Sequence, residues 1–259
     1  KIKRSQTENE RLLAQQALAR ILADTKGLAM KVGQLQADMD GGNAFQELVT
    51  GVEPLPLKQM LPELNKSLGF PAKKVFKKID EAVAAASLGQ VHFAKLKTGE
   101  KVAIKIRYPN IADAIETELR IAGLMPDIGP VKQWGFDIKA YKIGLRNNML
   151  RELNYLSEAN RQHDFFKAVR VEGLYIPQVY HELCRESILV QSRASGVLIN
   201  QIKDWPKKDK LVVGEILLTT LFKSIFVAGE VHGDPHAGNV LYDYDKTGRP
   251  MVSLLDYGC

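Results

Sequence analysis

Two short polar segments near the end of the sequence constrain its fold more than any other feature. The first, His232–Asn239, reads His-Gly-Asp-Pro-His-Ala-Gly-Asn, and the second is Asp256-Tyr257-Gly258. Residues 240–244 and 251–255 between them are rich in strand-forming side chains and flank a turn-rich Asp-Lys-Thr-Gly-Arg-Pro stretch, which predicts a β-hairpin. Because the two strands of a hairpin begin and end side by side, Asn239 and Asp256 are expected to return to the same place.

Asp234, Asn239 and Asp256 have the order and spacing of a kinase-type catalytic loop followed by a metal-binding Asp-aromatic-Gly turn. Phosphoryl transfer needs one carboxylate to orient the attacking hydroxyl, here Asp234. It also needs an amide oxygen and a second carboxylate to hold the divalent cations that bridge the phosphates, here Asn239 and Asp256. The alternative interpretation is a polar loop ahead of a surface hairpin.

The composition is that of an ordinary globular protein, with 45% hydrophobic and 25% charged residues, and 259 residues suffice for one large or two small domains. A formal net charge of +6 favours an anionic partner such as a nucleotide or an acidic lipid surface. The sequence contains no zinc-site spacing and no aromatic–basic RNA-binding motif, so nucleic acid is not predicted as a partner.

The two cysteines, Cys184 and Cys259, are too few for a disulfide framework and indicate a reducing compartment. The sequence shows neither a signal peptide nor a transmembrane run. Its longest apolar stretch, residues 211–229, is interrupted by Glu215 and Lys223 and therefore predicts a buried helix rather than a membrane span. Because the sequence begins without Met and stops one residue after Gly258, it is expected to be a piece of a longer protein.

Hydrophobic periodicity and Gly/Pro breaks predict an α+β fold in three parts. These are an N-terminal helical extension, a lobe with a sheet and inserted helices, and a partial helical lobe, over residues 1–72, 73–192 and 193–259. Helices are expected over residues 5–40, 57–68, 111–125, 138–169 and 208–229. Strands are expected within residues 76–94, over 101–108, and near 175–180 and 187–191.

The strand predicted over residues 101–108 contains a lysine in the run Val-Ala-Ile-Lys. Strand alternation places Val102, Ile104 and Ile106 on one face and Lys105 on the other. A strand, a glycine-containing turn and a strand bearing Val-Ala-Ile-Lys form the phosphate-gripping hairpin of a protein kinase, so Lys105 is predicted to contact the α- and β-phosphates of a nucleotide.

A lysine of this kind needs a glutamate partner from a neighbouring helix. Glu158, within Tyr-Leu-Ser-Glu-Ala-Asn, is the candidate. Glu116 and Glu118 are nearer to Lys105 in the sequence and remain rivals, and exposed helix charges are the alternative interpretation.

The turn ahead of this lysine contains the three alanines Ala84–Ala86 and then Ser87 and Gly89, where a kinase normally has several glycines. Alanine restricts positive φ, so this loop is expected to be stiffer than a glycine-rich one and to face a nucleotide differently.

Taken in order, these segments resemble the UbiB/AarF family of atypical kinase-like proteins. The resemblance spans nearly the whole chain and rests on Lys31-Val32-Gly33-Gln34, Ala84–Val91, Val102–Lys105, Glu152–Tyr155 with Glu158-Ala159, His232–Asn239 and Asp256-Tyr257-Gly258. A Lys-x-Gly-Gln helix joined to an alanine-rich loop is not expected in ordinary kinases, which makes the combination specific.

The resemblance implies that the helix carrying Lys31, Gly33 and Gln34 folds over the active site, where an ordinary kinase admits a peptide, with Lys31 near Glu152. Lys31 and Gln34 are three residues apart and share a helix face, although a solvated face is the alternative. The implied cofactors are ATP and Mg²⁺ or Mn²⁺. The residues expected at the site are Ala84, Ala85, Ala86, Ser87, Gly89, Gln90, Val91 and Lys105 for the nucleotide, Asn239, Asp256 and Glu152 for the metal, and Asp234, Lys105 and Glu158 for catalysis.

Three residues depart from the patterns of the family or of kinases. Asn154 stands where the family has the Asp of Glu-x-Asp, which keeps an oxygen ligand but loses a charge, so a different metal affinity or nucleotide preference is expected. Ala237 replaces a proline, and a mild effect is expected. Gly233 replaces the arginine that ordinary kinases place before the catalytic Asp, so activation by a phosphorylated loop is not expected.

The sequence therefore predicts a protein-kinase-like α+β fold with an antiparallel N-lobe sheet, an N-terminal helical extension and a partial helical C-lobe. The resemblance implies an ATP-binding, Mg-dependent atypical kinase or ATPase that supports isoprenoid quinone (ubiquinone-type) or prenyl-lipid metabolism. A quinone precursor or prenyl lipid and a membrane surface are the partners it implies. It places the protein on the cytoplasmic or organelle-matrix side, associated with the membrane through segments outside this chain.

Two alternative functions stay open. The first is a nucleotide-switched scaffold that binds ATP without productive transfer, for which the Asn154 change leaves room. The second is a small-molecule phosphotransferase of the aminoglycoside or choline type, because His-Gly-Asp followed by Asn five positions later also occurs there.

Overall fold

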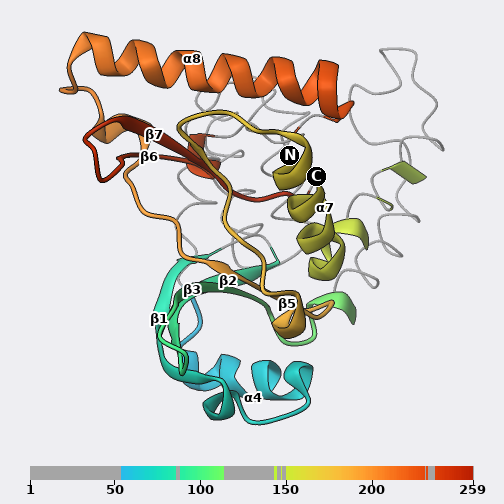
Figure 1. Ribbon diagram of the computed structural model, residues 1–259. Helices are drawn as coiled ribbons and strands as arrows, with labels where there is room; N and C mark the ends of the chain where they lie inside the picture. The colour runs from blue at the N-terminus through green and yellow to red at the C-terminus, as the bar shows by residue number, and fades with distance from the viewer. Residues whose placement is uncertain are drawn as a thin grey trace, which may run out of the picture. The chain divides into compact units, whose positions relative to one another are not determined.

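The computed structural model describes residues 54–85, 88–113, 143–144, 147, 150–230, 232 and 237–258 (Figure 1). The helix predicted over residues 5–40, most of the one predicted over 111–125, and most of residues 138–149 of the one predicted over 138–169 lie outside these residues. The chain divides into two compact units. The larger consists of residues 64–80, 92–105 and 154–259, and the other of residues 1–63, 81–91 and 106–153.

A four-stranded sheet contains β1 (Phe76–Ala85), β2 (Gly89–Leu96), β3 (Lys101–Arg107) and β5 (Ile188–Ser192), in that order. Short connections join β1 to β2 and β2 to β3, as antiparallel neighbours allow. The second connection turns at Gly99, whose φ of 112° is a conformation that favours glycine. The antiparallel N-lobe sheet predicted from the sequence is thus confirmed.

The strand β3 carries its side chains as the alternation predicts. Val102, Ile104 and Ile106 are fully buried, whereas Lys105 lies on the other face with 15% of its side chain exposed. This face of β3 is where the candidate site is built.

The helix α4 (Leu57–Leu68) has the bounds that the sequence predicts. It buries Met60, Leu64 and Leu68, which recur every four residues along one side. Gly69 ends it with a left-handed φ of 78°, and its N–H donates to Asn65 O at 3.0 Å.

The helix α7 (Tyr155–Ala168) covers the second half of the helix predicted over 138–169. Residues 150–152 are also helical, but the helix is interrupted at Leu153 and Asn154 before α7 begins. Asn154 is the N-cap of α7, because its side-chain oxygen accepts a hydrogen bond from Ser157 N at 3.1 Å. The buried face of α7 consists of Tyr155, Glu158, Ala159, Gln162 and Phe165.

A second sheet has the order β4-β7-β6 and contains the predicted hairpin. The strands β6 (Val240–Tyr244) and β7 (Pro250–Leu254) pair antiparallel, with Val240 opposite Leu254. The strand β4 (Leu174–Tyr175) is parallel to β7 and much shorter than the strand predicted over 175–180. Pro177 lacks an N–H for the ladder, and beyond it only an isolated bridge joins Val179 to Gln191.

The hydrophobic core of the larger unit lies between α7, the second sheet and α8 (Lys207–Lys223), which Figure 1 shows along one side of the β6–β7 hairpin. Its buried members are Phe165, Val169, Ile176, Ile202, Val213, Ile216, Val240, Tyr242, Val252, Leu254 and Tyr257. Gly173 lets α8 approach closely, since a Cβ there would lie 2.6 Å from Ile216 Cδ1.

The long helix predicted over residues 208–229 forms, but the prediction that it is buried is wrong. α8 continues as a π-helical segment, Ser224–Ala228, and ends at Gly229 with a φ of 70°. Only the stripe Val213, Ile216, Thr220 and Ser224 is buried, because one face alone meets the core. Leu218, Phe222 and Phe226 are exposed, Phe226 by 76%. By length and composition alone, Lys207–Ala228 is the one helix among the described residues that could cross a membrane.

Candidate active site

Three charged side chains from three elements of the larger unit meet around one ammonium group. Lys105 comes from β3, Glu158 from the first turns of α7, and Asp256 from the segment after β7. Lys105 Nζ donates to Glu158 Oε1 at 3.1 Å and Oε2 at 3.0 Å, and to Asp256 Oδ2 at 3.3 Å. We call these three residues the Lys105 cluster.

Burial and mutual charge set the ionisation of the Lys105 cluster. Burial would lower the pKa of Lys105, but Asp256 and Glu158 outweigh it and raise the pKa well above its usual range. Lys105 lowers the pKa of Asp256 to about 2, whereas burial raises the pKa of Glu158. Lys105 and Asp256 are therefore both charged at neutral pH. Glu158 is 3% exposed and Asp256 36% exposed, so Asp256 is the carboxylate that solvent or a ligand can reach.

The hairpin brings Asn239 next to the same segment. Leu255 N donates to Asn239 O at 2.8 Å, one rung beyond the Val240–Leu254 pair. The predicted return of Asn239 to the neighbourhood of Asp256 is thus a property of the β6–β7 ladder.

The Asp256-Tyr257-Gly258 turn is held by a hydrogen bond to the Asp256 side chain and by two aromatic contacts. Asp256 has a φ of 60°, a value uncommon for non-glycine residues. Its Oδ1 accepts a hydrogen bond from Gly258 N at 3.0 Å. Tyr257 is buried, with its ring centroid 5.3 Å from that of Phe165 and 5.0 Å from that of His232. His232 Nε2 donates to Leu255 O at 2.9 Å, which ties the start of the predicted catalytic loop to this turn.

The structure adds two residues that motif spacing did not reveal. The ring of Tyr155 lies 4.9 Å below Lys105 Nζ, a cation–π distance. Arg161 Nη2 donates to Gly258 O at 2.8 Å. Tyr155 and Arg161 each lie three residues from Glu158 on α7. Because residues at this spacing share a helix face, both could have been predicted from the sequence as neighbours of Glu158.

The predicted nucleotide-binding residues differ in how exposed they are and in the elements to which they belong. Ala84 and Ala85 are exposed and end β1 rather than forming a loop, and Gly89 starts β2. Gln90 is fully buried. Its side-chain oxygen accepts a hydrogen bond from Leu55 N at 2.8 Å, and its side-chain nitrogen donates one to Leu55 O at 2.7 Å. Gln90 therefore fastens the segment before α4 to β2. Val91 is half-buried.

Several predicted site residues lie outside the described residues, namely Lys31, Gly33, Gln34, Ala86, Ser87 and Asp234, as do the rivals Glu116 and Glu118. Glu152 is half-buried and belongs to the smaller unit. The roles of these residues, and the three-part domain division, stay predictions. Within the described part of the chain, Glu158 is the glutamate that pairs with Lys105.

In the described residues, no group of three or more His, Cys, Asp or Glu side chains is placed to hold a metal ion by itself. This is compatible with a magnesium nucleotide, because Mg²⁺ is usually bound through one or two carboxylates together with substrate phosphates. The Lys105 cluster has one positive and two potentially negative groups, with Asp256 ionised and partly exposed, so its donor set fits an added cation.

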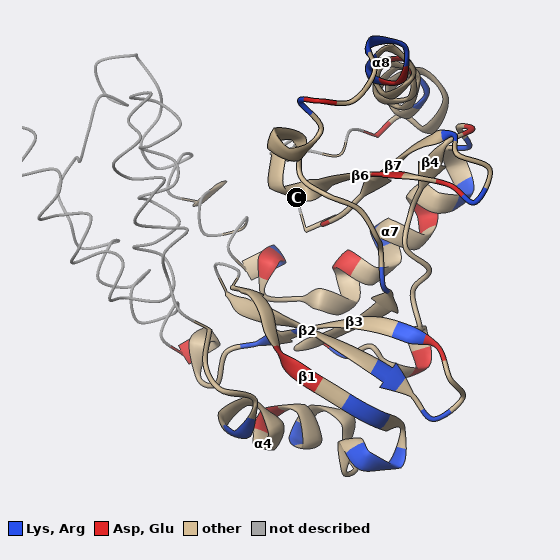
Figure 2. Cartoon of the chain, turned by 90° about the vertical axis from the view of Figure 1, so that its left-hand side faces the viewer, with Lys and Arg blue, Asp and Glu red and all other residues tan. Residues whose placement is uncertain are grey.

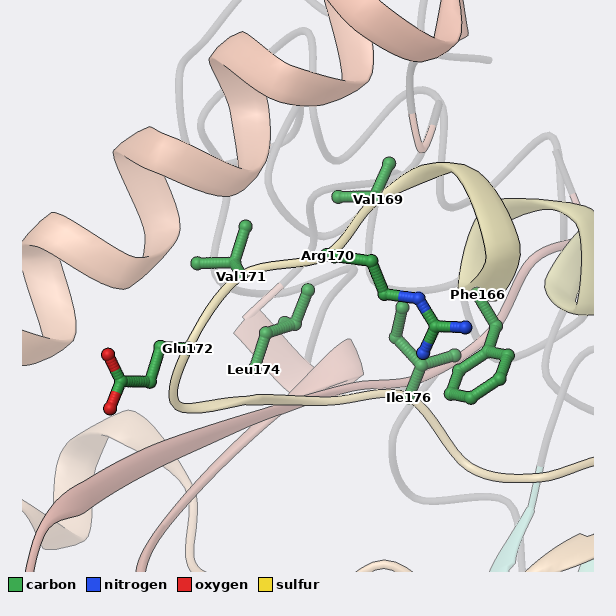
Figure 3. A pocket seen from close by; sticks show the side chains of 7 residues that line it. All are labelled: Phe166, Val169, Arg170, Val171, Glu172, Leu174 and Ile176. Carbon is green, nitrogen blue, oxygen red and sulfur yellow. The ribbon is translucent and has the colours of Figure 1, made fainter.

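A separate pocket of about 310 Å³ opens near the C-terminal end of α7 (Figure 3). Its lining residues are Phe166, Val169, Arg170, Val171, Glu172, Leu174 and Ile176, and none of them belongs to the Lys105 cluster. The Arg170 guanidinium lies 4.1 Å from the Phe166 ring centroid, and Glu172 pairs with Arg249. Five of the seven lining residues are apolar and the other two, Arg170 and Glu172, carry opposite charges, so the pocket does not concentrate positive charge for a triphosphate.

Lys and Arg residues lie on several of the described elements, and a number of them gather at the end of the first sheet where β2 turns into β3 (Figure 2).

A lysine on the third strand of an antiparallel sheet, a glutamate on the helix α7 and an aspartate after a hairpin define a protein of the kinase-like class. The chain belongs to the family of the ABC1 atypical kinase-like domain, whose model matches residues 47–259. The resemblance to UbiB/AarF proteins and the kinase-like fold are thereby confirmed.

Known proteins resemble this chain over most of its length. It is 29% identical over 267 residues to an ABC1 family protein of Schizosaccharomyces pombe, covering 94% of this chain and 48% of the relative. It is 26% identical over 247 residues to the mitochondrial atypical kinase coq-8 of Caenorhabditis elegans, covering 92% and 33%. The chain thus spans about half or less of these curated relatives.

A solved structure of Mycobacterium tuberculosis Rv3197 in complex with erythromycin has a TM-score of 0.68 and 29% identity to this chain. The match covers 98% of this chain and 67% of Rv3197. It supports the kinase-like fold.

Proposed function

We propose that this chain binds ATP with Mg²⁺ and acts as an atypical kinase or ATPase. The observation that carries the proposal is the position of Lys105 Nζ, 3.0 Å from Glu158 and 3.3 Å from Asp256. In a kinase-like site these are the phosphate-binding lysine, its helix partner and the metal-side carboxylate.

The chemistry of each side chain suits that role. Lys105 carries the positive charge that would contact the α- and β-phosphates, and Glu158 orients it through two hydrogen bonds. Asp256 is ionised and partly exposed, so its carboxylate can bind a cation and Lys105 together. Bound Mg²⁺ would supply charge that offsets the negative charge on the phosphoryl oxygens. Asp234 would accept the proton of the attacking hydroxyl, and Asn239 would supply an amide oxygen.

The acceptor that we propose is a small molecule of isoprenoid quinone (ubiquinone-type) or prenyl-lipid metabolism, or water in an ATPase reaction. This part rests on the resemblance to UbiB/AarF proteins. The name of the C. elegans relative places that protein in mitochondria, which supports an organelle-matrix or cytoplasmic side for this one. Cover of the site by the Lys31-Val32-Gly33-Gln34 segment would restrict peptide acceptors.

Binding of a fluorescent ATP analogue and ATP turnover test the nucleotide role. We expect Lys105→Met to weaken binding about tenfold or more, because it removes a charge-assisted contact to phosphate. Asp256→Asn should keep binding without Mg²⁺ but lose Mg-dependent turnover. Lys101→Met is the matched control, since Lys101 starts the same strand and is exposed.

Two outcomes would redirect the proposal. If Lys105→Met and the wild type bound the ATP analogue with equal affinity, the Lys105 cluster would be excluded as the ATP-binding site. Metal-independent binding with no turnover above background would favour the nucleotide-switched scaffold.

A further inference from the structure

We propose that Arg161 is a positioning residue that holds the Asp256-Tyr257-Gly258 turn in its metal-binding geometry. The inference deepens the proposed function and rests on it for the metal, but the contacts themselves are independent of any ligand.

The contacts form a chain from α7 to the carboxylate. Arg161 Nη2 donates to Gly258 O at 2.8 Å, and Gly258 N donates to Asp256 Oδ1 at 3.0 Å. Arg161 thus fixes the residue whose N–H orients one oxygen of Asp256. The other oxygen, Oδ2, is the one that accepts Lys105 Nζ at 3.3 Å.

The same helix holds the turn and the lysine. Glu158 and Arg161 are three residues apart on α7, so Glu158 binds Lys105 and Arg161 binds Gly258 from neighbouring positions. The hydrogen bonds, together with the α7 backbone between Glu158 and Arg161, therefore close a ring through Lys105, Gly258 and Asp256. A displacement of α7 would disturb the lysine and the carboxylate together.

The turn needs such a restraint for two reasons. Asp256 has a φ of 60°, which is costly for a residue with a Cβ and must be maintained by its surroundings. Gly258 also has little space, because a Cβ there would lie 3.0 Å from Asp256 Oδ1 and 3.7 Å from Glu158 Oε2. The backbone at Gly258 therefore sets where the Asp256 carboxylate points.

Arg161 is expected to contribute little to the stability of the fold. Its Nε is buried without a hydrogen-bond partner among the described residues, which costs free energy. Removing Arg161 should therefore change the melting temperature little while it releases Gly258. If Arg161 served mainly in packing, its removal would lower the melting temperature without releasing Gly258.

The test compares Arg161→Met, Arg161→Lys and the wild type. For Arg161→Met we expect the Mg²⁺ concentration at half-maximal ATP turnover to rise about tenfold, as for loss of one charge-assisted hydrogen bond. Binding of the ATP analogue without Mg²⁺ should stay within about twofold, because Lys105 keeps Glu158. Arg161→Lys keeps one donor and should recover part of the loss.

Arg185→Met is the matched control, because Arg185 Nη1 also donates to backbone carbonyls, Cys184 O at 2.6 Å and Glu182 O at 3.0 Å, outside the Lys105 cluster. It should leave the Mg²⁺ dependence unchanged. An unchanged Mg²⁺ dependence in Arg161→Met, or parallel losses of melting temperature and Mg-free binding, would overturn the inference.

Hydrogen exchange separates this inference from the proposed function. If the wild type neither binds nor turns over ATP, the proposed function fails. The Gly258 amide should still exchange about tenfold faster in Arg161→Met than in the wild type, as expected for a weakened local restraint. Equal exchange rates in the two proteins would reject the positioning role even then.

Discussion

At the scale of single residues, Lys105 is the point on which the site depends. One ammonium group serves two carboxylates that different elements supply, and it keeps Asp256 ionised. Motif spacing predicted Glu158 as a candidate partner alongside Glu116 and Glu118. The contact with Glu158 depends on how α7 packs beside β3, which no local pattern encodes.

Asp256 should give the protein an acid-sensitive contribution to stability. Lys105 lowers the pKa of Asp256 to about 2, below the value of about 3.9 for an unfolded chain. The folded state then binds the proton more weakly, so ionised Asp256 stabilises the fold above about pH 4 and loses this effect as the pH falls toward 2. The melting-temperature difference between wild type and Asp256→Asn should therefore shrink over this interval.

Thermal melts followed by circular dichroism between about pH 5 and 2 would measure this difference. Burial raises the pKa of Glu158 and acts in the opposite direction, but Glu158 is present in both proteins. Asp164→Asn, at an exposed position of α7, is the control. A difference that stays constant with pH would contradict the assigned coupling.

At the scale of elements, α7 connects the parts of the site. Its first turns place Tyr155 under Lys105 and Glu158 against it, and its last turn packs Phe165 on Tyr257. Asn154 marks the start of this helix, and the sequence predicts for it only a change in metal affinity or nucleotide preference. In the structure Asn154 is an N-cap, a role that Asn and Asp perform about equally.

The cap predicts unequal effects of two substitutions. Asn154→Ala should lower the free energy of unfolding by about 1 kcal/mol, whereas Asn154→Asp should change it by only a few tenths (~0.3 kcal/mol). Urea denaturation would measure both. Asn160→Ala, at an exposed position inside α7, should be neutral or slightly stabilising. Equal losses for Asn154→Ala and Asn154→Asp would show that the cap is not what Asn154 contributes.

At the scale of the described molecule, the main unexpected feature is the apolar face of α8. Leu211, Leu218, Phe222, Phe226 and Val227 are all exposed, Leu218 by 57%. An apolar surface of this kind is uncommon in proteins that stay monomeric. The buried stripe of the same helix, in contrast, contributes directly to the core.

Substitutions on the two faces of α8 should therefore separate stability from association. Phe226→Gln should change the free energy of unfolding by less than about 0.5 kcal/mol, because the side chain is largely exposed. It should also reduce self-association in sedimentation velocity. Ile216→Ala, on the buried stripe, should cost about 2–5 kcal/mol. A similar loss for both variants would mean that the Phe226 face is covered in solution.

The sequence by itself determined the local features of this protein. The β6–β7 hairpin, the bounds of α4 and the outward face of Lys105 follow from turn residues and side-chain periodicity, which act over a few residues. The motif order likewise pointed to the kinase-like class. Only the tertiary structure decided which groups meet. Lys105 and Asp256 are 151 positions apart and Arg161 and Gly258 are 97, so their contacts depend on the packing of whole elements. The exposure of α8 was decided in the same way, because an apolar sequence does not state how much of its surface the core can cover.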